Sequence, residues 1–398
     1  MAAGGFGLAP TGFLDGRDAV PDGKKLKIME EALVYRIVLT GGPCGGKSTA
    51  MSQITDRLQG FGFDVYRVPE AATIVLGGGV RISGVSSSQL IAIQSELMRV
   101  MIAMEDSFTR LAHATGRRSI VLCDRGTMDV SAYLPPESWS AMLNEVGWSL
   151  VALRDRRYEA VIHLVTAADG AEGFYTKANN AVRTESPSLA RELDKKVRDA
   201  WIGHPHLRVV DNSTDFTGKI QRVVAAVCQV VGVPQPHEIE RKFLIRPGAS
   251  SHPVPVPFEE VEIEQTYLVS PDGREARVRR RGQNGSFSYT HTIKTQSTSG
   301  DRVEIEKQIT ARDYVALLAQ ADPARQRVIK RRRVFLWENQ YFEWDIYLSP
   351  RAGLEILEIE VEDIHAPITL PAFLSIDREV TTEPDFSNAK IALNPSPA

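Results

Sequence analysis

The first half of the chain alternates short apolar runs with segments of helical periodicity. Apolar runs that predict strands occupy residues 35–40, 64–68, 119–123, 160–165 and 207–210. Segments that predict helices occupy residues 47–58, 90–114, 189–201 and 218–230, and the one at 90–114 is apolar on almost every side. Because strands that alternate with helices form a parallel sheet covered on both faces, this half predicts an α/β domain.

The pattern changes at residues 231–236, where two prolines interrupt a helical segment. Alternation of apolar and polar residues then recurs at 238–243, 261–269, 275–281, 287–294, 303–309, 328–336, 341–348 and 354–361, with a helix predicted at 311–321. About eight antiparallel strands predict a barrel or a strongly curved sheet. We therefore expect a flexible N-terminal tail at 1–30, an α/β domain at 31–233 and an antiparallel α+β domain at 234–398.

Composition and charge narrow the class of protein. The 398 residues are 43% hydrophobic and 24% charged, as in average globular proteins, which excludes a disordered or coiled-coil chain. The net charge of −3 argues against general nucleic-acid binding. The three cysteines are widely spaced, which indicates neither a disulfide framework nor a zinc site and favours a cytoplasmic location. No apolar run approaches the roughly 18 residues of a membrane span.

Residues 41–48, with the sequence GGPCGGKS, match the phosphate-loop pattern G-x-x-x-x-G-K-S between a predicted strand and a predicted helix. Glycines allow backbone N–H groups to surround a phosphate, and the helix N-terminus adds a positive dipole end. Lys47 would reach the β- and γ-phosphates, and the Ser48 hydroxyl would bind Mg²⁺. The predicted nucleotide-binding residues are Gly41, Gly42, Pro43, Cys44, Gly45, Gly46, Lys47, Ser48, Thr49, Asp124 and Arg125.

Three charged residues follow predicted strands of the same half. Asp124 ends an apolar strand, as expected of a carboxylate that holds Mg²⁺ with Ser48, although it could instead cap the following turn. Arg125 would contact phosphate or pair with a carboxylate. Glu70 would activate an acceptor hydroxyl or a water, because the C-terminal ends of parallel strands face the ligand crevice. A plain surface glutamate at this loop position fits the pattern equally well.

The phosphate loop, the Val-Pro-Glu at 68–70 and the Asp-Arg-Gly at 124–126 resemble the P-loop ATPases related to small-molecule and nucleotide kinases. This resemblance implies a purine nucleoside triphosphate, GTP or ATP, held with Mg²⁺. Arg183 resembles a lid arginine, with a salt-bridged helix residue as the alternative. The Thr-Lys-Ala-Asn at 176–179 is similar to the guanine-reading T-K-x-D motif, but Asn179 replaces its aspartate, so the base preference stays open.

Charged residues of both signs recur at alternate positions of the predicted strands in the second half. The groups that share a strand face are Glu238, Glu240 and Lys242; Arg277 and Arg279; Thr292 and Lys294; Glu304 and Glu306; Lys330 and Arg332; Glu343 and Asp345; and Glu358 and Glu360. If the opposite, apolar faces pack outward, these charges line one interior. A water-exposed face of an open sheet is the alternative.

A charged interior of this kind limits the ligand that it can take. Transferring an ion to the interior costs several kcal/mol even after relaxation, to order of magnitude, so such charges need water and counter-ions. Clustered carboxylates suit hard divalent cations, and clustered Arg and Lys suit phosphate oxygens. The two sets together predict a polyphosphate bridged by metal.

The E-x-E-x-K motif at Glu238, Glu240 and Lys242 and the later paired positions resemble the CYTH domain, or triphosphate tunnel metalloenzyme family, from His237 to the end. The resemblance implies that glutamates hold Mg²⁺ or Mn²⁺, that basic residues bind a small triphosphate or polyphosphate, and that a water attacks the terminal phosphorus. The implied triphosphate-binding residues are Lys242, Arg277, Arg279, Lys294, Lys330 and Arg332.

The same resemblance supplies roles for the acidic residues. The metal ligands that it implies are Glu238, Glu240, Glu304, Glu306, Glu358 and Glu360; Ser48 and Asp124 are the metal ligands expected from the phosphate-loop pattern of the other half. The expected catalytic residues are Glu240, Lys242, which would help to deprotonate the water, and Glu70 at the nucleotide site.

The order of the two domains is similar to that of the TRPL-translocation-defect proteins. That resemblance implies a GTP- and anionic-phospholipid-binding regulator of membrane traffic, peripheral to membranes and without tunnel catalysis. Three functions therefore stay open: a two-domain enzyme that binds a nucleotide and hydrolyses a triphosphate, such a regulator, and a small-molecule kinase with the tunnel as a sensor.

Overall fold

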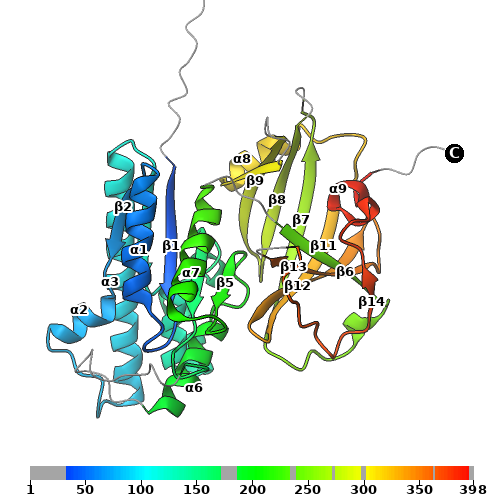
Figure 1. The fold of residues 1–398 in the computed structure, drawn as a ribbon. Helices are drawn as coiled ribbons and strands as arrows, with labels where there is room; N and C mark the ends of the chain where they lie inside the picture. Colours follow the sequence, from blue (N-terminus) through cyan, green and yellow to red (C-terminus); the bar gives the residue numbers. More distant parts are fainter. Residues whose placement is uncertain are drawn as a thin grey trace, which may run out of the picture. The chain divides into compact units, whose positions relative to one another are not determined.

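The computed structural model describes residues 33–171, 186–233, 239–270, 274–296, 302–361 and 364–393 (Figure 1). The tail expected at 1–30, the motif at 176–179, Arg183 and Glu238 lie outside these residues.

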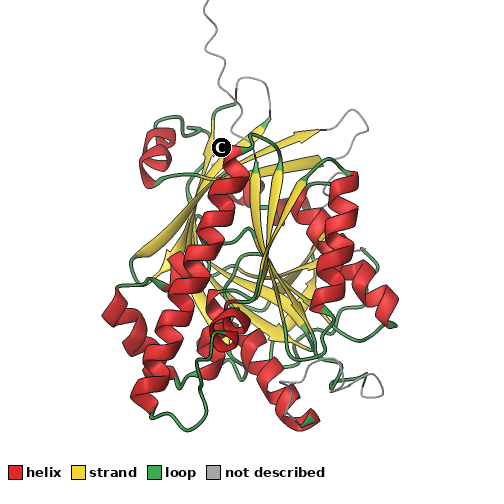
Figure 2. Cartoon of the chain, turned by 90° about the vertical axis from the view of Figure 1, so that its left-hand side faces the viewer, coloured by secondary structure: helices red, strands yellow, loops and turns green. Residues whose placement is uncertain are grey.

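The first half forms a parallel sheet in the order β2-β3-β1-β4-β5, which confirms the predicted α/β class. Its strands are β1 (Val34–Thr40), β2 (Asp64–Val68), β3 (Ser119–Asp124), β4 (Ala160–Leu164) and β5 (Leu207–Val210). Alternate residues of β1 pack on opposite sides of the sheet. Ile37 lies in the hydrophobic cluster that includes residues of α1 (Lys47–Gly60) and α7 (Phe216–Val231). Val38 lies in the hydrophobic cluster that includes residues of α3 (Ser87–Ala114). Figure 2 shows helices on both sides of the strands. The central strands are apolar on both faces because both are covered.

Shorter elements complete this half. They are α2 (Ala71–Gly77), a 3-10 helix (Thr127–Tyr133), α4 (Pro136–Val146), α5 (Leu150–Leu153) and α6 (Pro187–Asp199). The sequence pattern predicted only α6 among them, because the others are too short or too irregular for a clear helical period. α6 begins where the Ser186 hydroxyl accepts a hydrogen bond from Leu189 N at 3.3 Å.

The second half forms an antiparallel sheet of nine strands in the order β10-β9-β8-β7-β11-β12-β13-β6-β14. The strands are β6 (Ile239–Ile245), β7 (Phe258–Leu268), β8 (Glu275–Gln283), β9 (Ser286–Gln296), β10 (Arg302–Gln308), β11 (Val328–Trp337), β12 (Gln340–Ser349), β13 (Glu355–Val361) and β14 (Ile376–Glu379). Three short 3-10 or α-helical segments accompany them: Ala249–Ser251, Pro384–Phe386 and α9 (Asn388–Ile391), besides α8 (Ala311–Leu318). The eight predicted strands are all present, and the short β14 was not predicted.

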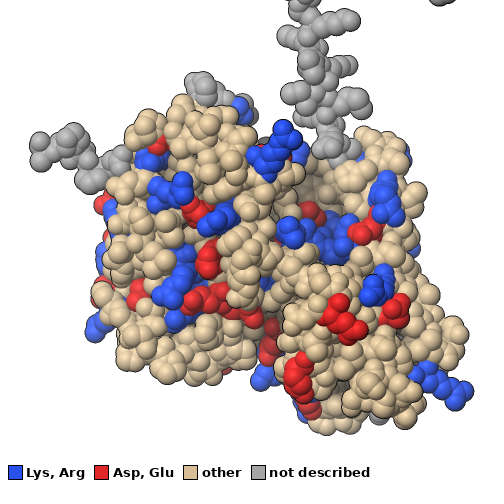
Figure 3. All heavy atoms as spheres, turned by 180° about the vertical axis from the view of Figure 1, so that it is seen from behind, with Lys and Arg blue, Asp and Glu red and all other residues tan. Residues whose placement is uncertain are grey.

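The apolar face of this sheet packs outward, as the alternation predicts. Val278 of β8 packs with Tyr314 of α8, and Trp344 of β12 packs with Phe243 of β6 under the loop that contains Phe373. Cross-strand register brings charged positions of the other face together: Glu358 lies opposite Lys242. On the molecular face seen in Figure 3, the described Lys, Arg, Asp and Glu side chains are interspersed in sign.

Buried polar contacts join the two halves at a junction that we define by Arg154, Asp155 and His204 on one side and Arg281 and Tyr341 on the other. Arg281 Nη1 donates to Asp155 Oδ2 at 2.9 Å, and Tyr341 OH donates to the His204 carbonyl at 2.9 Å. Burial raises the pKa of the Asp155 carboxyl, but Arg281 and Arg154 outweigh it and hold that pKa below its usual range. These charges lie in the interior because each has a partner. In the described part of the chain, no helix combines the length and hydrophobicity needed to cross a bilayer.

His204 is a neutral imidazole at this junction. Its Nδ1 accepts from His206 N at 3.0 Å, which assigns the proton to Nε2, and Nε2 donates to the Tyr158 carbonyl at 3.1 Å. Burial is the main cause that lowers the pKa of His204 from 6.5 to about 3.

Stability should therefore fall in acid through His204. Below pH 6.5 the His204 imidazole becomes protonated in the unfolded chain, whereas in the folded chain it stays neutral until the pH falls to about 3. The free energy of unfolding should decrease by up to about 1.4 kcal/mol per pH unit in that window. Urea denaturation at pH 7, 6 and 5 measures this slope, which His204→Gln should reduce. Exposed His252→Gln should keep the wild-type slope, and an equal slope in both variants would refute the assignment.

Candidate functional sites

The phosphate loop lies between β1 and α1, as predicted, and its glycines are required by close contacts. Gly41 has a φ of 133° and Gly46 a φ of 94°, values that side chains other than glycine rarely adopt. A Cβ on Gly41 would lie 2.1 Å from the Leu164 carbonyl oxygen, and one on Gly42 would lie 2.7 Å from Asp194 Oδ1. Strand β4 and helix α6 therefore enclose the loop.

Lys47 lies folded over the loop. Its Nζ donates to the Gly41 carbonyl at 3.0 Å and to the Gly42 carbonyl at 3.2 Å. Burial and the nearby charge of Arg125 lower the pKa of Lys47 to about 8. The next residues, Ser48 and Thr49, are exposed at the start of α1.

Asp194 of α6 belongs to this site and was not predicted from the sequence. The Gly42 N–H donates to its Oδ1 at 2.6 Å, and His163 Nε2 lies 3.3 Å from the same oxygen. Burial raises the pKa of the Asp194 carboxyl, but His163 and the hydrogen bonds outweigh burial and lower it. The signal was present, because Asp194 shares the buried face of an amphipathic helix with Ala190 and Val197.

The structure brings Glu70, Asp124 and Arg125 together beside Lys47. Arg125 Nε donates to Glu70 Oε1 at 2.6 Å, so Arg125 pairs with a carboxylate, one of its two expected roles. Asp124 Oδ1 is buried and, in the described part of the chain, has no hydrogen-bond partner. Burial raises the pKa of Asp124 in spite of the Lys47 charge. An unpartnered carboxylate oxygen close to Lys47 of the phosphate loop is an oxygen ligand of the type that Mg²⁺ prefers.

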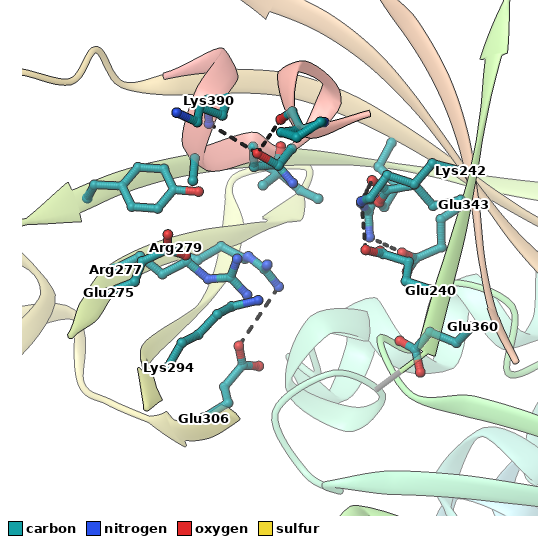
Figure 4. Close-up of a pocket in the computed structure, with 18 of the residues that line it drawn as sticks. Glu240, Lys242, Glu275, Arg277, Arg279, Lys294, Glu306, Glu343, Glu360 and Lys390 are labelled. Atoms are coloured by element: carbon teal, nitrogen blue, oxygen red, sulfur yellow. Dashed lines mark hydrogen bonds and ion pairs between the residues drawn. The ribbon is translucent and has the colours of Figure 1, made fainter. Parts of the chain in front are cut away.

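The charged faces of the second sheet line a cavity of about 1040 Å³, which we call the tunnel cavity (Figure 4). Its walls carry predicted residues from both charge sets: Glu240, Lys242, Arg277, Arg279, Lys294, Glu306, Arg332, Glu358 and Glu360. Lys330, also predicted, is buried beside Asp345 and does not line the cavity. The side chain of Glu304 lies outside the described part of the structure, as Glu238 does.

One side of the tunnel cavity is a carboxylate-rich network. Lys242 Nζ lies 2.5 Å from Glu358 Oε1 and 2.6 Å from Glu240 Oε2. Burial opposes the charged form of Lys242, but Glu240 and Glu358 raise its pKa well above its usual range. Burial and the charge of Glu358 raise the pKa of Glu240. The two carboxylates thus converge on a single cation.

Arg332 connects this network to β12. Its Nε lies 2.6 Å from Asp345 Oδ1, its Nη2 lies 2.7 Å from Glu358 Oε2, and its Nη1 contacts Glu343. Burial raises the pKa of Glu358, but Lys242, Lys330 and Arg332 outweigh burial and hold it well below its usual range. Glu358 therefore remains ionised because it contacts cations on both of its oxygens.

The opposite side of the tunnel cavity is basic. Figure 4 shows Arg277, Arg279 and Lys294 pointing into the cavity, across from Glu240 and Lys242. Arg279 Nη1 lies 3.9 Å from Glu306, while its buried Nε has no hydrogen-bond partner in the described part of the chain. Arg279 therefore retains donor capacity for an anion in the cavity.

Several lining residues were not predicted, among them Arg325, Asn388 and Lys390 of the second half and Pro205 and His206 of the first half. They lie in loops, in the short α9 or in the other half of the chain. No periodic pattern could have marked them, because only the tertiary fold brings these segments to the cavity.

Comparison with known proteins gives two family matches. Residues 36–219 match the model of an AAA domain, and residues 236–386 match the model of the CYTH domain. An inorganic triphosphatase from Acetivibrio thermocellus is 30% identical over 159 residues, which cover 40% of this chain and 94% of that protein. The chain belongs to the CYTH family. The resemblances to a P-loop domain and a CYTH domain are confirmed, whereas that to the TRPL-translocation-defect proteins stays a prediction.

Solved structures show more distant likenesses. A crystal structure of an inorganic triphosphatase is 27% identical, with a TM-score of 0.30, and the match covers 40% of this chain and 96% of that one. A protein from Pyrococcus horikoshii OT3 is 21% identical, with a TM-score of 0.26, over 32% of this chain and 79% of its own.

Adjacent arginines of β11 should differ sharply in their effect on stability. Arg332→Ala should lower the free energy of unfolding by about 3–5 kcal/mol, because it removes the cation that buried carboxylates contact. Arg331 is 43% exposed and lies 3.3 Å from Glu260, so Arg331→Ala should cost less than about 1 kcal/mol. Urea denaturation of both variants checks the contrast. Equal losses would show that the network around Arg332 does not stabilise the tunnel.

Proposed function

We propose that the tunnel cavity binds and hydrolyses a small triphosphate or polyphosphate with Mg²⁺ or Mn²⁺. The observation that carries the proposal is the opposition of Arg277, Arg279 and Lys294 to Glu240 and Glu358 across one cavity. A triphosphate with bound metal carries negative oxygens and positive ions side by side, so it complements both walls. The inorganic triphosphatase activity of the relative from Acetivibrio thermocellus supports the same substrate class.

The donor set suits a divalent cation. In the described part of the chain, no three His, Cys, Asp or Glu side chains are already gathered as a metal site. One oxygen of Glu240 and one of Glu358 nevertheless both contact Lys242 Nζ, so these two oxygens lie close to each other. We assign the metal to Glu240, Glu358 and Glu360, oxygen ligands of the type that Mg²⁺ and Mn²⁺ prefer. When bound, the metal would neutralise charge on the phosphate oxygens.

The remaining steps belong to the side chains. The guanidinium groups of Arg277 and Arg279 and the Lys294 ammonium would hold the phosphate oxygens, the arginines through paired N–H donors. Binding of the phosphate oxygens by these three side chains would align the terminal phosphorus for in-line attack by a water. In the arrangement described here Lys242 is a cation, because the glutamates raise its pKa. Its assignment as the group that deprotonates the water stays a prediction.

Glu240→Gln tests tunnel catalysis. The change removes one charge with little change in shape, and we expect metal-dependent phosphate release from tripolyphosphate to fall by about 100-fold or more. Release from tripolyphosphate, ATP and GTP should be compared with and without a chelator. The control is Glu264→Gln, because Glu264 pairs with Arg280 and Arg327 rather than lining the cavity. Unchanged release in Glu240→Gln would show that the tunnel is not catalytic.

We further propose that the P-loop half binds a purine nucleoside triphosphate with Mg²⁺ at Ser48 and Asp124. The enclosed glycines, Lys47 and the unpartnered Asp124 oxygen support this assignment. Glu70 would face the terminal phosphate, with Arg125 holding its carboxylate in place.

Lys47→Ala separates the two sites. It should weaken binding of fluorescent GTP or ATP by about tenfold or more, since it removes the cation expected at the β- and γ-phosphates. Tripolyphosphate hydrolysis should remain within twofold of wild type, to order of magnitude, because the tunnel has its own cations. Exposed Lys195→Ala on α6 is the matched control. Nucleotide affinity that is equal in both variants would contradict the site, and the ratio of GTP to ATP affinity measures base preference.

A further inference from the structure

The P-loop half supplies part of the wall of the tunnel cavity. Pro205 and His206, which come just before β5, line the cavity together with the strands of the second half. β5 is the edge strand of the parallel sheet and packs against β12. The cavity is therefore completed by a segment that lies outside the CYTH match at residues 236–386.

Arg208 of β5 forms an ion pair with Glu360 of β13, between Nη2 and Oε2. The two side chains are 23% and 25% exposed, so water screens the pair only in part. Glu360 lies opposite Glu240 in the register of β13 and β6, and Figure 4 shows it apart from the paired Glu240 and Lys242. A carboxylate of the tunnel is thus neutralised by a cation from the nucleotide-binding half.

This ion pair is separate from the contacts that hold the junction. Arg281 contacts Asp155, and Tyr341 contacts the His204 carbonyl, without involving a tunnel carboxylate. Elsewhere between the halves, Arg198 Nη1 donates to Asn339 Oδ1 at 2.5 Å. Replacing Arg208 therefore leaves these connections in place, and Arg198 provides a matched arginine for comparison.

We propose that Arg208 competes with a divalent cation for Glu360 and thereby lowers the metal affinity of the tunnel. The inference rests on the proposed metal site and adds a residue of the other domain to it. Glu360 Oε2 already contacts the guanidinium, so a metal ion at that oxygen has to displace Arg208, and a metal ion at Oε1 has to share the carboxylate charge with it. Arg208 is a positioning residue, because it acts on the metal through Glu360.

The strength of the Arg208–Glu360 ion pair sets the size and direction of the expected change in metal affinity. A partly exposed ion pair contributes up to about 1 kcal/mol, and about 1.4 kcal/mol corresponds to a tenfold change in affinity. Arg208→Gln, which removes the competing charge, should therefore tighten Mn²⁺ binding by up to about fivefold. Arg208→Lys keeps the charge and should stay within about twofold of wild type. The neutral Arg208→Met, which retains the aliphatic stem, should reproduce the gain if Arg208→Gln folds poorly.

Mn²⁺ binding to the full chain, measured by calorimetry and by electron paramagnetic resonance without substrate or nucleotide, tests the proposal. Arg198→Ala should leave the affinity unchanged. In a Glu360→Gln background, Arg208→Gln should give no further gain, because the carboxylate for which the two cations compete is gone. Thermal unfolding of each variant identifies any loss of folded protein.

The outcomes separate this proposal from the proposed function. A wild-type chain that neither binds Mn²⁺ nor releases phosphate from tripolyphosphate overturns both. A wild type that does both, with neutral Arg208 variants that bind Mn²⁺ no more tightly, overturns only the role of Arg208. A gain that persists in the Glu360→Gln background also overturns it, because the effect would not pass through Glu360.

Discussion

The tunnel depends on one electrostatic constraint: a sheet that buries its charged face must place every charge beside a partner. Burying an unpaired ion costs several kcal/mol, to order of magnitude, which is more than a marginally stable domain can lose at many positions. Glu358 meets this constraint by contacting both Lys242 and Arg332. The cross-strand register of the sheet makes such contacts possible, because it places Glu358 opposite Lys242.

The two proposed phosphate sites differ in the groups that they offer. The phosphate loop offers backbone N–H groups, a helix N-terminus and Lys47, and its backbone packs closely on neighbouring groups at Gly41 and Gly42. The tunnel cavity relies on charged side chains on the walls of a sheet. A site made of backbone groups contains few ionised side chains. The tunnel contains many, and each of its carboxylates has to be matched by a nearby cation.

The halves meet where the edge strand β5 packs against β12. β5 pairs with β4, whose Leu164 carbonyl packs against Gly41 of the phosphate loop. The same pair of strands therefore contacts the nucleotide site at one end and carries Arg208 to Glu360 at its edge. Neutral His204 and the paired charges of Asp155 and Arg281 make this region a buried, polar part of the structure.

The local pattern of apolar and polar residues determined most of the strands, the long helices and the strand faces that carry charge, and a short motif determined the phosphate loop. These features were predictable because periodicity and short motifs depend only on residues that are neighbours in the chain. Short elements such as α9 were not predicted, because they contain too few residues to show a period. Only the tertiary structure decided that Asp194 contacts Gly42, that Lys330 does not line the cavity, that His206 does, and that Arg208 contacts Glu360. These facts depend on packing between segments far apart in sequence, which no local period records.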